Sequence, residues 1–341
     1  MISLFGNNST SARISKLERA VNDLDTTKVD KITGKGLSTY DFTAGYKAKL
    51  DSLDDEIIDP VIPSAVVASD DYVTPQMFGA TGKNNHDDTI AIQQAIDSGK
   101  SVYLPAGTYT ISEPIVIDGK HFWSFHAGDA TIRYTGEGYA IRVLMAENCC
   151  IEIGAIIAPN GGGIEFCSSS GDSWNQYIRV DFSYIRCKTD CIHIEVSNGG
   201  WSNENQVHGG RFAAGENGVY LHHADENYTN GWKFYNCGIE GVTNGFVFDA
   251  GMGFIHDMIV IAPRYEESHE IVLKTIGLVF DCLWIGTGVF RPTVIECSTD
   301  TSRFEIIAPI RTIWDGNLIR HRGCIINGKL MAEKTAYETV K

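Results

Sequence analysis

An internal repeat is the feature that most limits how this 341-residue chain can fold. The repeated segments align Ile192, Val219, Phe246 and Ile271, whose numbers advance by 27, 27 and 25. In a second aligned set, Ile185, Phe212, Ile239 and Tyr265, they advance by 27, 27 and 26. A repeat with two short strands cannot bury its apolar face alone, so successive repeats must stack. The pattern predicts a mainly β fold, a parallel β-helix of about eight coils, each rising about 4.8 Å.

The alternation within each repeat predicts which side chains face outward. Ile192 and Ile194 should point inward, because successive side chains of a strand point to opposite faces. One outer column then consists of His193, Tyr220, Val247 and Val272, and a second consists of Glu195, His222, Asp249 and Lys274. The first column is unusually apolar for a solvent face. We expect Tyr220 and Val247 to lie in an oligomer interface; the alternative is isolated apolar surface residues, which are common.

The composition excludes several classes of protein. The formal net charge is −15 at pH 7, whereas nucleic-acid binding needs a basic surface. No apolar run reaches the roughly 18 residues of a transmembrane helix, and the first residues do not resemble a signal peptide. The nine cysteines show no repeated CxxC spacing, so they predict neither a disulfide framework nor a zinc site. We therefore predict no metal, no cofactor, no nucleic acid and no membrane insertion.

Residues 1–54 differ in pattern from the repeats. Ile14, Leu17, Val21 and Leu24 alternate spacings of three and four, which is the a/d pattern of a coiled coil. Fewer than two heptads cannot hold together alone in water, so this seam predicts self-association or docking on a larger body. Two prolines and several acidic residues within 55–72 are typical of a linker.

The stretch 74–112 joins the linker to the repeats. It contains the turn sequence FGATG from Phe78, the pair Asp87 and Asp88, a short amphipathic helix and the strand sequence VYLPAGTYTI from Val102. The two aspartates should cap the helix, because carboxylates accept the free amides of a first helical turn and suit its dipole. The sequence therefore predicts that the two aspartates are helix caps rather than catalytic acids.

Two patterns carry a resemblance to known families. FGAxGxxxxDDTxAIQxAI followed by VYLPAGTY resembles the start of pectate-lyase-like right-handed β-helix domains, as found in phage tailspikes, although Lys83 and Asn84 replace the usual acid and glycine of the turn. KITGKGLSTYDFT, from Lys31, is similar to a connector of phage tail fibre and baseplate proteins. The resemblance implies a right-handed β-helix, a homotrimer, and a place in the virion tail or baseplate after assembly in the host cytoplasm. We expect the β-helix over 73–327 and a C-terminal tail over 328–341.

Glu240 and Glu266 are the candidate catalytic pair. They occupy equivalent positions in adjacent repeats, so strand stacking would place them about 5 Å apart. Two carboxylates at that distance suit a retaining glycosidase, and their repulsion would raise one pKa. The alternative is an acidic ladder on the surface, neutralised by Arg264 or by a cation.

The candidate glycan-binding residues are aromatic and polar side chains near glycine-rich turns. A tryptophan on such a turn can stack on a sugar ring, while amides and carboxylates bind hydroxyl groups. The alternative is a tryptophan packed over the turn. The set comprises Trp201, Asn203, Glu204, Trp232, Arg264 and Tyr265.

Three functions are consistent with these observations. The first is a phage tail appendage that attaches to other tail or baseplate proteins through residues 1–54 and binds a bacterial surface polysaccharide without cleaving it. The second is a depolymerase, a glycosidase or lyase, on the same β-helix. The third is a structural virion adaptor. The sequence favours the first, because it contains no GxSxG or HExxH motif and no clear calcium site.

Overall fold

The computed structural model describes residues 72–266, 271–286, 288–289, 294–296, 304–307, 318–320, 324–326 and 329–330. The expected coiled coil with Ile14, Leu17, Val21 and Leu24, the connector and nearly all of the linker lie outside the described residues. In the part described, no helix is long and apolar enough to cross a membrane. Strand β30 (Lys329–Leu330) pairs antiparallel with β29 (Cys324–Ile326), so strand pairing continues past the boundary expected at 327.

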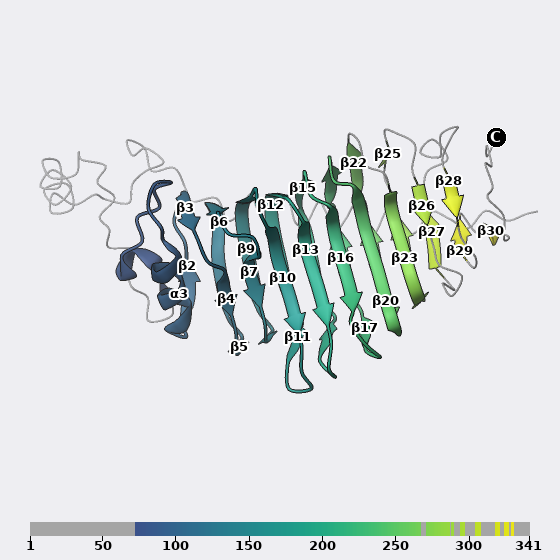
Figure 1. Cartoon of the computed structure of the whole chain (residues 1–341), viewed down its shortest axis with the longest axis horizontal. Coiled ribbons are helices and arrows are strands. Elements are labelled where there is room, and N and C mark those ends of the chain that lie inside the picture. Colours follow the sequence, from purple (N-terminus) through teal and green to yellow (C-terminus); the bar gives the residue numbers. More distant parts are fainter. Residues whose placement is uncertain are drawn as a thin grey trace, which may run out of the picture. The chain divides into compact units, whose positions relative to one another are not determined.

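The chain forms a parallel β-helix whose strands lie in three sheets (Figure 1). Sheet A contains β1 (Tyr72–Val73), β2 (Ser101–Tyr103), β3 (Gly107–Ile111), β6 (Ser124–Tyr134), β9 (Cys150–Ala158), β12 (Arg179–Cys187), β15 (Gln206–Ala213), β18 (Lys233–Tyr235), β19 (Gly238–Glu240), β21 (Ile259–Ile261), β22 (Arg264–Glu266), β24 (Leu283–Ile285), β25 (Gly288–Val289), β27 (Phe304–Ile307), β29 and β30. Sheet B contains β4 (Ile115–Ile117), β7 (Tyr139–Val143), β10 (Gly162–Ser168), β13 (Asp190–Val196), β16 (Asn217–His223), β17 (Tyr228–Asn230), β20 (Asn244–His256), β23 (Ile271–Phe280), β26 (Val294–Glu296) and β28 (Leu318–Arg320). Sheet C contains β5 (Lys120–His121), β8 (Ala146–Glu147), β11 (Trp174–Gln176) and β14 (Trp201–Asn203).

The strand registers confirm the predicted repeat and correct one of its alignments. Ile192 pairs with Val219 and Val219 with Phe246, as the sequence predicts. Phe246, however, pairs with Leu273, and Ile271 pairs with Asn244. The prediction shifted this coil by two positions, which preserves the alternation of strand faces and therefore left no sign of error. The second set, from Ile185 to Tyr265, is paired as predicted.

The same registers correct the first outer column. Lys274, and not Val272, follows Val247 in this column, and Val272 is buried. His193 and Val247 are themselves almost fully buried, and Tyr220 is half-buried. Side chains of adjacent coils cover one another along the column, so its apolar character is accounted for within one chain. The oligomer interface at Tyr220 and Val247 stays a prediction.

Stacked side chains of equivalent positions fill the interior. Phe246 meets Phe234 edge to face at a centroid distance of 5.4 Å and Trp284 at 5.3 Å. Such contacts contribute beyond the burial of their area. A polar ladder also runs through three coils: the Asn217 amide donates to Asp190 Oδ1 (2.7 Å), and the Asn244 amide donates to Asn217 Oδ1 (2.8 Å).

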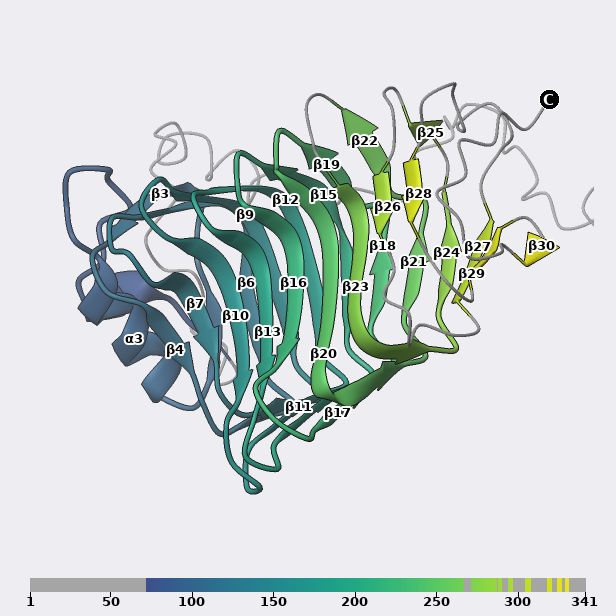
Figure 2. The same cartoon turned by 45° about the vertical axis from the view of Figure 1, so that its right-hand side comes forward.

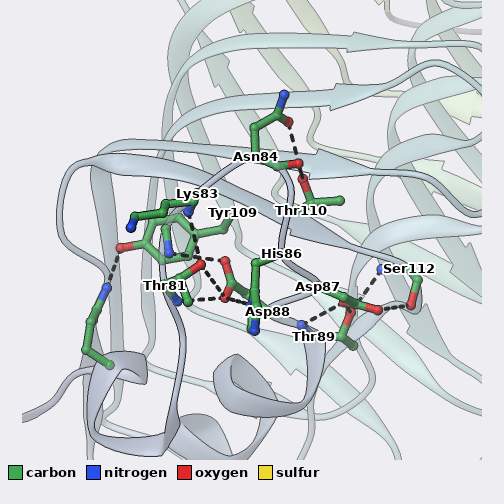
Figure 3. Close-up of polar contacts among 12 residues, drawn as sticks. Thr81, Lys83, Asn84, His86, Asp87, Asp88, Thr89, Tyr109, Thr110 and Ser112 are labelled. Atoms are coloured by element: carbon green, nitrogen blue, oxygen red, sulfur yellow. Dashed lines mark hydrogen bonds and ion pairs between the residues drawn. The ribbon is translucent and has the colours of Figure 1, made fainter.

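The first described coil is closed by the 3₁₀ helix η1 (Pro75–Phe78) and the helix α3 (Thr89–Asp97), and Figure 3 shows how two aspartates hold this end. Asp87 accepts the Thr89 amide (3.0 Å) at the start of α3, as predicted, and also the Ser112 hydroxyl (2.5 Å). The side chain of Asp88 makes no capping bond, which corrects the prediction. It is fully buried and accepts the amides of Thr81 (2.7 Å) and Gly82 (3.2 Å), so it fixes the turn that precedes the helix.

Candidate functional site

A polar groove crosses the outer face of sheet A. It consists of two depressions with volumes of about 280 and 340 Å³ that adjoin at Ser183 and Asn236. The first is lined by Ser183, Gly210, Arg211, Asn236, Gly238, Ile239, Glu240 and Arg264. The second is lined by Gly128, Glu152, Ile153, Asp181, Phe182, Ser183, His208, Gly209 and Asn236. We call the two together the bend groove, because the backbone is irregular beside them: β6 has a register shift after Ala127, and Gly209 of β15 has a φ of 43°.

Small residues at the bend create the hollow. In β9 and β15 the bend positions are Gly154 and Gly210. A Cβ atom on Gly154 would lie 2.4 Å from the Gly128 carbonyl oxygen, and one on Gly210 would lie 2.3 Å from that of Ser183. Neighbouring coils can approach here only because these side chains are absent. Further along, the sheet divides, with β19 and β22 above β18 and β21 in the view of Figure 2.

One half of the groove carries acids and a histidine. Glu152, Asp181 and His208 share one outer column, since each pairs with the next in adjacent strands. Asp181 accepts two bonds from the Arg179 guanidinium, at 2.6 and 2.9 Å, and His126 contacts Glu152 at 3.2 Å. These groups are partly exposed, so their hydrogen-bonding capacity faces solvent rather than the core.

The other half carries two arginines and the candidate glutamates. Arg211, Gly238 and Arg264 follow one another in register, and the glycine leaves the space between the two arginines open. The Arg211 Nε atom lies 2.6 Å from the Glu240 carboxylate. Glu240 pairs in register with Glu266, as predicted, while the side chain of Glu266 lies outside the described residues. The Arg211 guanidinium and the Glu240 carboxylate therefore form an ion pair inside the groove.

The groove therefore contains two of the predicted residues, Glu240 and Arg264. Tyr265 is in register with Ile239, and its side chain lies outside the described residues. The sequence did not single out Glu152, Asp181, His208 and Arg211. The spacing of 27 from Asp181 to His208 and from Arg211 to Gly238 was available as a signal, but nothing local indicated that the sheet bends there.

Trp201, Asn203 and Glu204 lie on sheet C and the turn that follows it, outside the lining of the groove. The ring of Trp201 stacks on that of Trp174 at 5.4 Å with an interplanar angle of 7°. This contact occupies one face of the Trp201 ring. Asn203 accepts the backbone amide of Asn230 at 3.1 Å, and Glu204 occupies a turn with φ of 57°. Both have local structural roles, and Trp201 remains a partly exposed aromatic.

The prediction that Trp232 contacts glycan is wrong. Its side chain is fully buried, its indole N–H donates to the Ser202 carbonyl at 3.0 Å, and its ring packs on Phe166 and Phe234. Trp232 immediately precedes β18, and Phe234, two positions later, faces inward as well. The alternation rule would have placed Trp232 in the core had the strand been recognised.

Comparisons with known proteins agree with this fold. The sequence model of the family described as rhamnogalacturonase A/epimerase, pectate lyase-like, matches residues 74–124. That match agrees with the resemblance seen at the start of the repeats, and the structure as a whole is a parallel β-helix. No curated protein matches the chain.

Several solved structures have a similar chain path. ORF18 of Geobacillus virus E2 is 15% identical to this chain, with a TM-score of 0.43. The match covers 77% of this chain and 63% of ORF18, so this chain spans less than two thirds of that viral protein. The A-module of the Azotobacter vinelandii mannuronan C-5 epimerase AlgE4 is 15% identical, with a TM-score of 0.32. The match covers 75% of this chain and 95% of that module. The Dettilon tailspike protein gp208 is 11% identical, with a TM-score of 0.29. The match covers 75% of this chain and 68% of the tailspike chain.

Proposed function

We propose that this protein is a phage tail appendage that binds a bacterial surface polysaccharide along the bend groove. The observation that carries the proposal is the groove itself, an elongated hollow lined by charged and amide side chains. It runs from β6 to β22 across five strand spacings, which is about 24 Å and enough for several sugar units. The proposal includes a homotrimer located in the virion and docked on other tail proteins through residues 1–54.

The chemistry of the lining suits a polyhydroxylated ligand. Arg211 and Arg264 present planar arrays of donors, while Asp181, Glu152 and Glu240 present acceptors. Hydroxyl groups of sugars both donate and accept, so they can use donors and acceptors that lie close together. The mixture of charges also suits a neutral or weakly charged glycan, because neither sign dominates the groove.

Binding is favoured over cleavage by the surroundings of Glu240. A retaining glycosidase needs one carboxylic acid that is protonated and able to donate. The Glu240 carboxylate lies 2.6 Å from the Arg211 Nε atom, so it is already occupied by an ion pair within the groove. The register with Glu266 keeps a depolymerase as the second candidate, since equivalent positions on adjacent coils are the right distance apart.

The test measures retention and cleavage together. The full chain is incubated with host cell-wall or capsule glycan, and bound protein and new reducing ends are both measured. We expect retention without new ends, and a loss of about tenfold or more in affinity for Arg211→Ala, because a charge-assisted hydrogen bond contributes about 1.5–3 kcal/mol.

Arg133→Ala is the matched control, because Arg133 of β6 is an exposed arginine of the same sheet that does not line the groove. It should change affinity less than about twofold. Release of reducing ends that stops in Glu240→Gln would instead establish the depolymerase. The absence of both retention and cleavage would support the structural adaptor.

A further inference from the structure

A second polar cluster lies on the outer face of sheet B, away from the bend groove. Glu165 of β10 pairs in register with His193 of β13, and Glu195 follows two positions later on the same face of β13. One ligand atom from each of these three side chains lies within 4.8 Å of the other two. Glu165 and His193 are buried and Glu195 is partly exposed, so the cluster opens to solvent on one side.

The orientation of the His193 ring is held from behind by Asp190. The Nδ1–H donates to Asp190 Oδ2 at 2.8 Å. Asp190 also accepts the Tyr139 hydroxyl at 2.8 Å and the Asn217 amide at 2.7 Å. A carboxylate that accepts three hydrogen bonds holds the ring in place, so Nδ1 is occupied by Asp190 and Nε2 is the ring nitrogen that faces the cluster.

The Nε2 atom faces the opposite side of the ring, towards the carboxylates of Glu195 and Glu165. Its nearest carboxylate oxygen, on Glu195, lies at 3.6 Å, an ion-pair distance, and the His193 side chain is nine-tenths buried. One ligand atom of each of the three side chains thus points to a common space, where a cation would contact all three. On the far side of Glu165, the Arg142 guanidinium occupies one carboxylate oxygen and leaves the other available.

We propose that His193 Nε2 and the carboxylates of Glu165 and Glu195 bind a transition-metal dication of the Zn²⁺ class. An imidazole nitrogen with two carboxylates is a donor set that Zn²⁺, Co²⁺ or Mn²⁺ accepts, whereas Ca²⁺ and Mg²⁺ prefer oxygen ligands throughout. Asp190 would be the outer carboxylate that orients a metal-bound histidine. The open side next to Glu195 leaves coordination positions for water.

Such an ion would join two adjacent coils, because Glu165 belongs to β10 and the other two ligands to β13. Binding to the folded chain alone raises its stability in proportion to the logarithm of metal concentration. The site does not depend on the proposed function, since it shares no residue with the bend groove.

The experiment uses the full chain, stripped with a chelator and dialysed. Zn²⁺ is titrated by calorimetry and Co²⁺ by visible absorption, and Tm is recorded with and without Zn²⁺. We expect one site with a Co²⁺ spectrum free of thiolate bands, and a rise in Tm with Zn²⁺. His193→Gln and Glu195→Gln should abolish the site, and Asp190→Asn should weaken it by about 10–100-fold.

His208→Gln and Glu152→Gln are matched controls from the outer face of sheet A and should leave the titrations unchanged. Glu195→Gln keeps the size of a partly exposed side chain, so an unchanged circular dichroism spectrum would show that the fold is retained. Equal binding by Glu195→Gln and the unaltered chain would overturn the proposal. A thiolate band in the Co²⁺ spectrum would also overturn it. The absence of any binding above background would overturn it as well.

Discussion

At the residue scale, buried polar side chains carry much of the specificity of this fold. Asp88 is fully buried, and its two oxygens accept the amides of Thr81 and Gly82 and contact the His86 ring at 2.7 Å. His223 is equally buried, and its Nε2 atom lies 2.8 Å from the Thr229 hydroxyl. Each satisfies groups that would otherwise be left without partners in the interior, so each is a point where one substitution has a large effect.

Asp88→Ala should lower the free energy of unfolding by about 2–4 kcal/mol, because it leaves two turn amides without acceptors. Asp97→Ala, at the exposed end of α3, should cost less than about 1 kcal/mol. Chemical denaturation of both variants measures the difference. Similar losses in the two would mean that Asp88 does not hold the turn.

Acid should destabilise the protein through His223. Burial, together with the neighbouring His222, lowers the pKa of His223 from 6.5 to about 4, against a backbone hydrogen bond to Ala250 and the opposing charges of Asp225 and Asp249. Because the folded pKa lies below the unfolded one, this stabilisation is present above pH 6.5 and is lost as the pH falls from about 6.5 towards 4, to a total of roughly 3 kcal/mol.

Calorimetry between these pH values checks the expectation. His223→Gln removes the titrating group, so its Tm should fall less steeply with acid than that of the unaltered chain. Parallel curves would contradict the role of His223.

At the element scale, register decides what each strand contributes. One outer column of sheet A consists of Arg211, a glycine and Arg264 on successive coils. Because the glycine has no side chain, a hollow remains between the two arginines. At β18, register with the preceding coil places Phe234 inside, and Trp232 lies two positions earlier on the same face. Residue type alone does not separate a core tryptophan from a surface one, whereas the strand pairing does.

Trp232→Ala should therefore lower the free energy of unfolding by about 3–5 kcal/mol, since it leaves a cavity in the core and unpairs the Ser202 carbonyl. Trp201→Ala, which removes a partly exposed ring from a stack, should cost about 0.5–1.5 kcal/mol. Urea denaturation of the two variants compares these costs directly. A larger loss for Trp201→Ala would contradict the assignment of Trp232 to the core.

At the scale of the whole molecule, parallel stacking gives every described coil a partner on each side except at the ends of the helix. The first end is closed by α3 and the turn that Asp88 holds. Self-association is expected from the N-terminal seam, which is too short to be stable as a single helix. The outer column of sheet B offers a partner little apolar area, because Val247 is nearly fully buried.

Leu17→Glu and Leu24→Glu together should convert the oligomer to monomers, because charges at seam positions are incompatible with a buried interface. The circular dichroism of the β-helix should stay unchanged. Ser15→Glu, outside the seam, is the control. Light scattering that shows the same mass for all three proteins would refute the seam as the oligomer interface.

The sequence alone determined the β-helix, its period and its inward columns, because each coil repeats the same alternation, and even the shift of two positions at Ile271 preserves that alternation. It also placed Glu240 and Glu266 in register. Tertiary structure decided what no local pattern contains. The bend of sheet A makes the groove from glycines that look like ordinary turn residues, and Glu165 meets His193 only because their two coils stack in register. Those outcomes depend on backbone direction and register between coils, which a single strand does not specify.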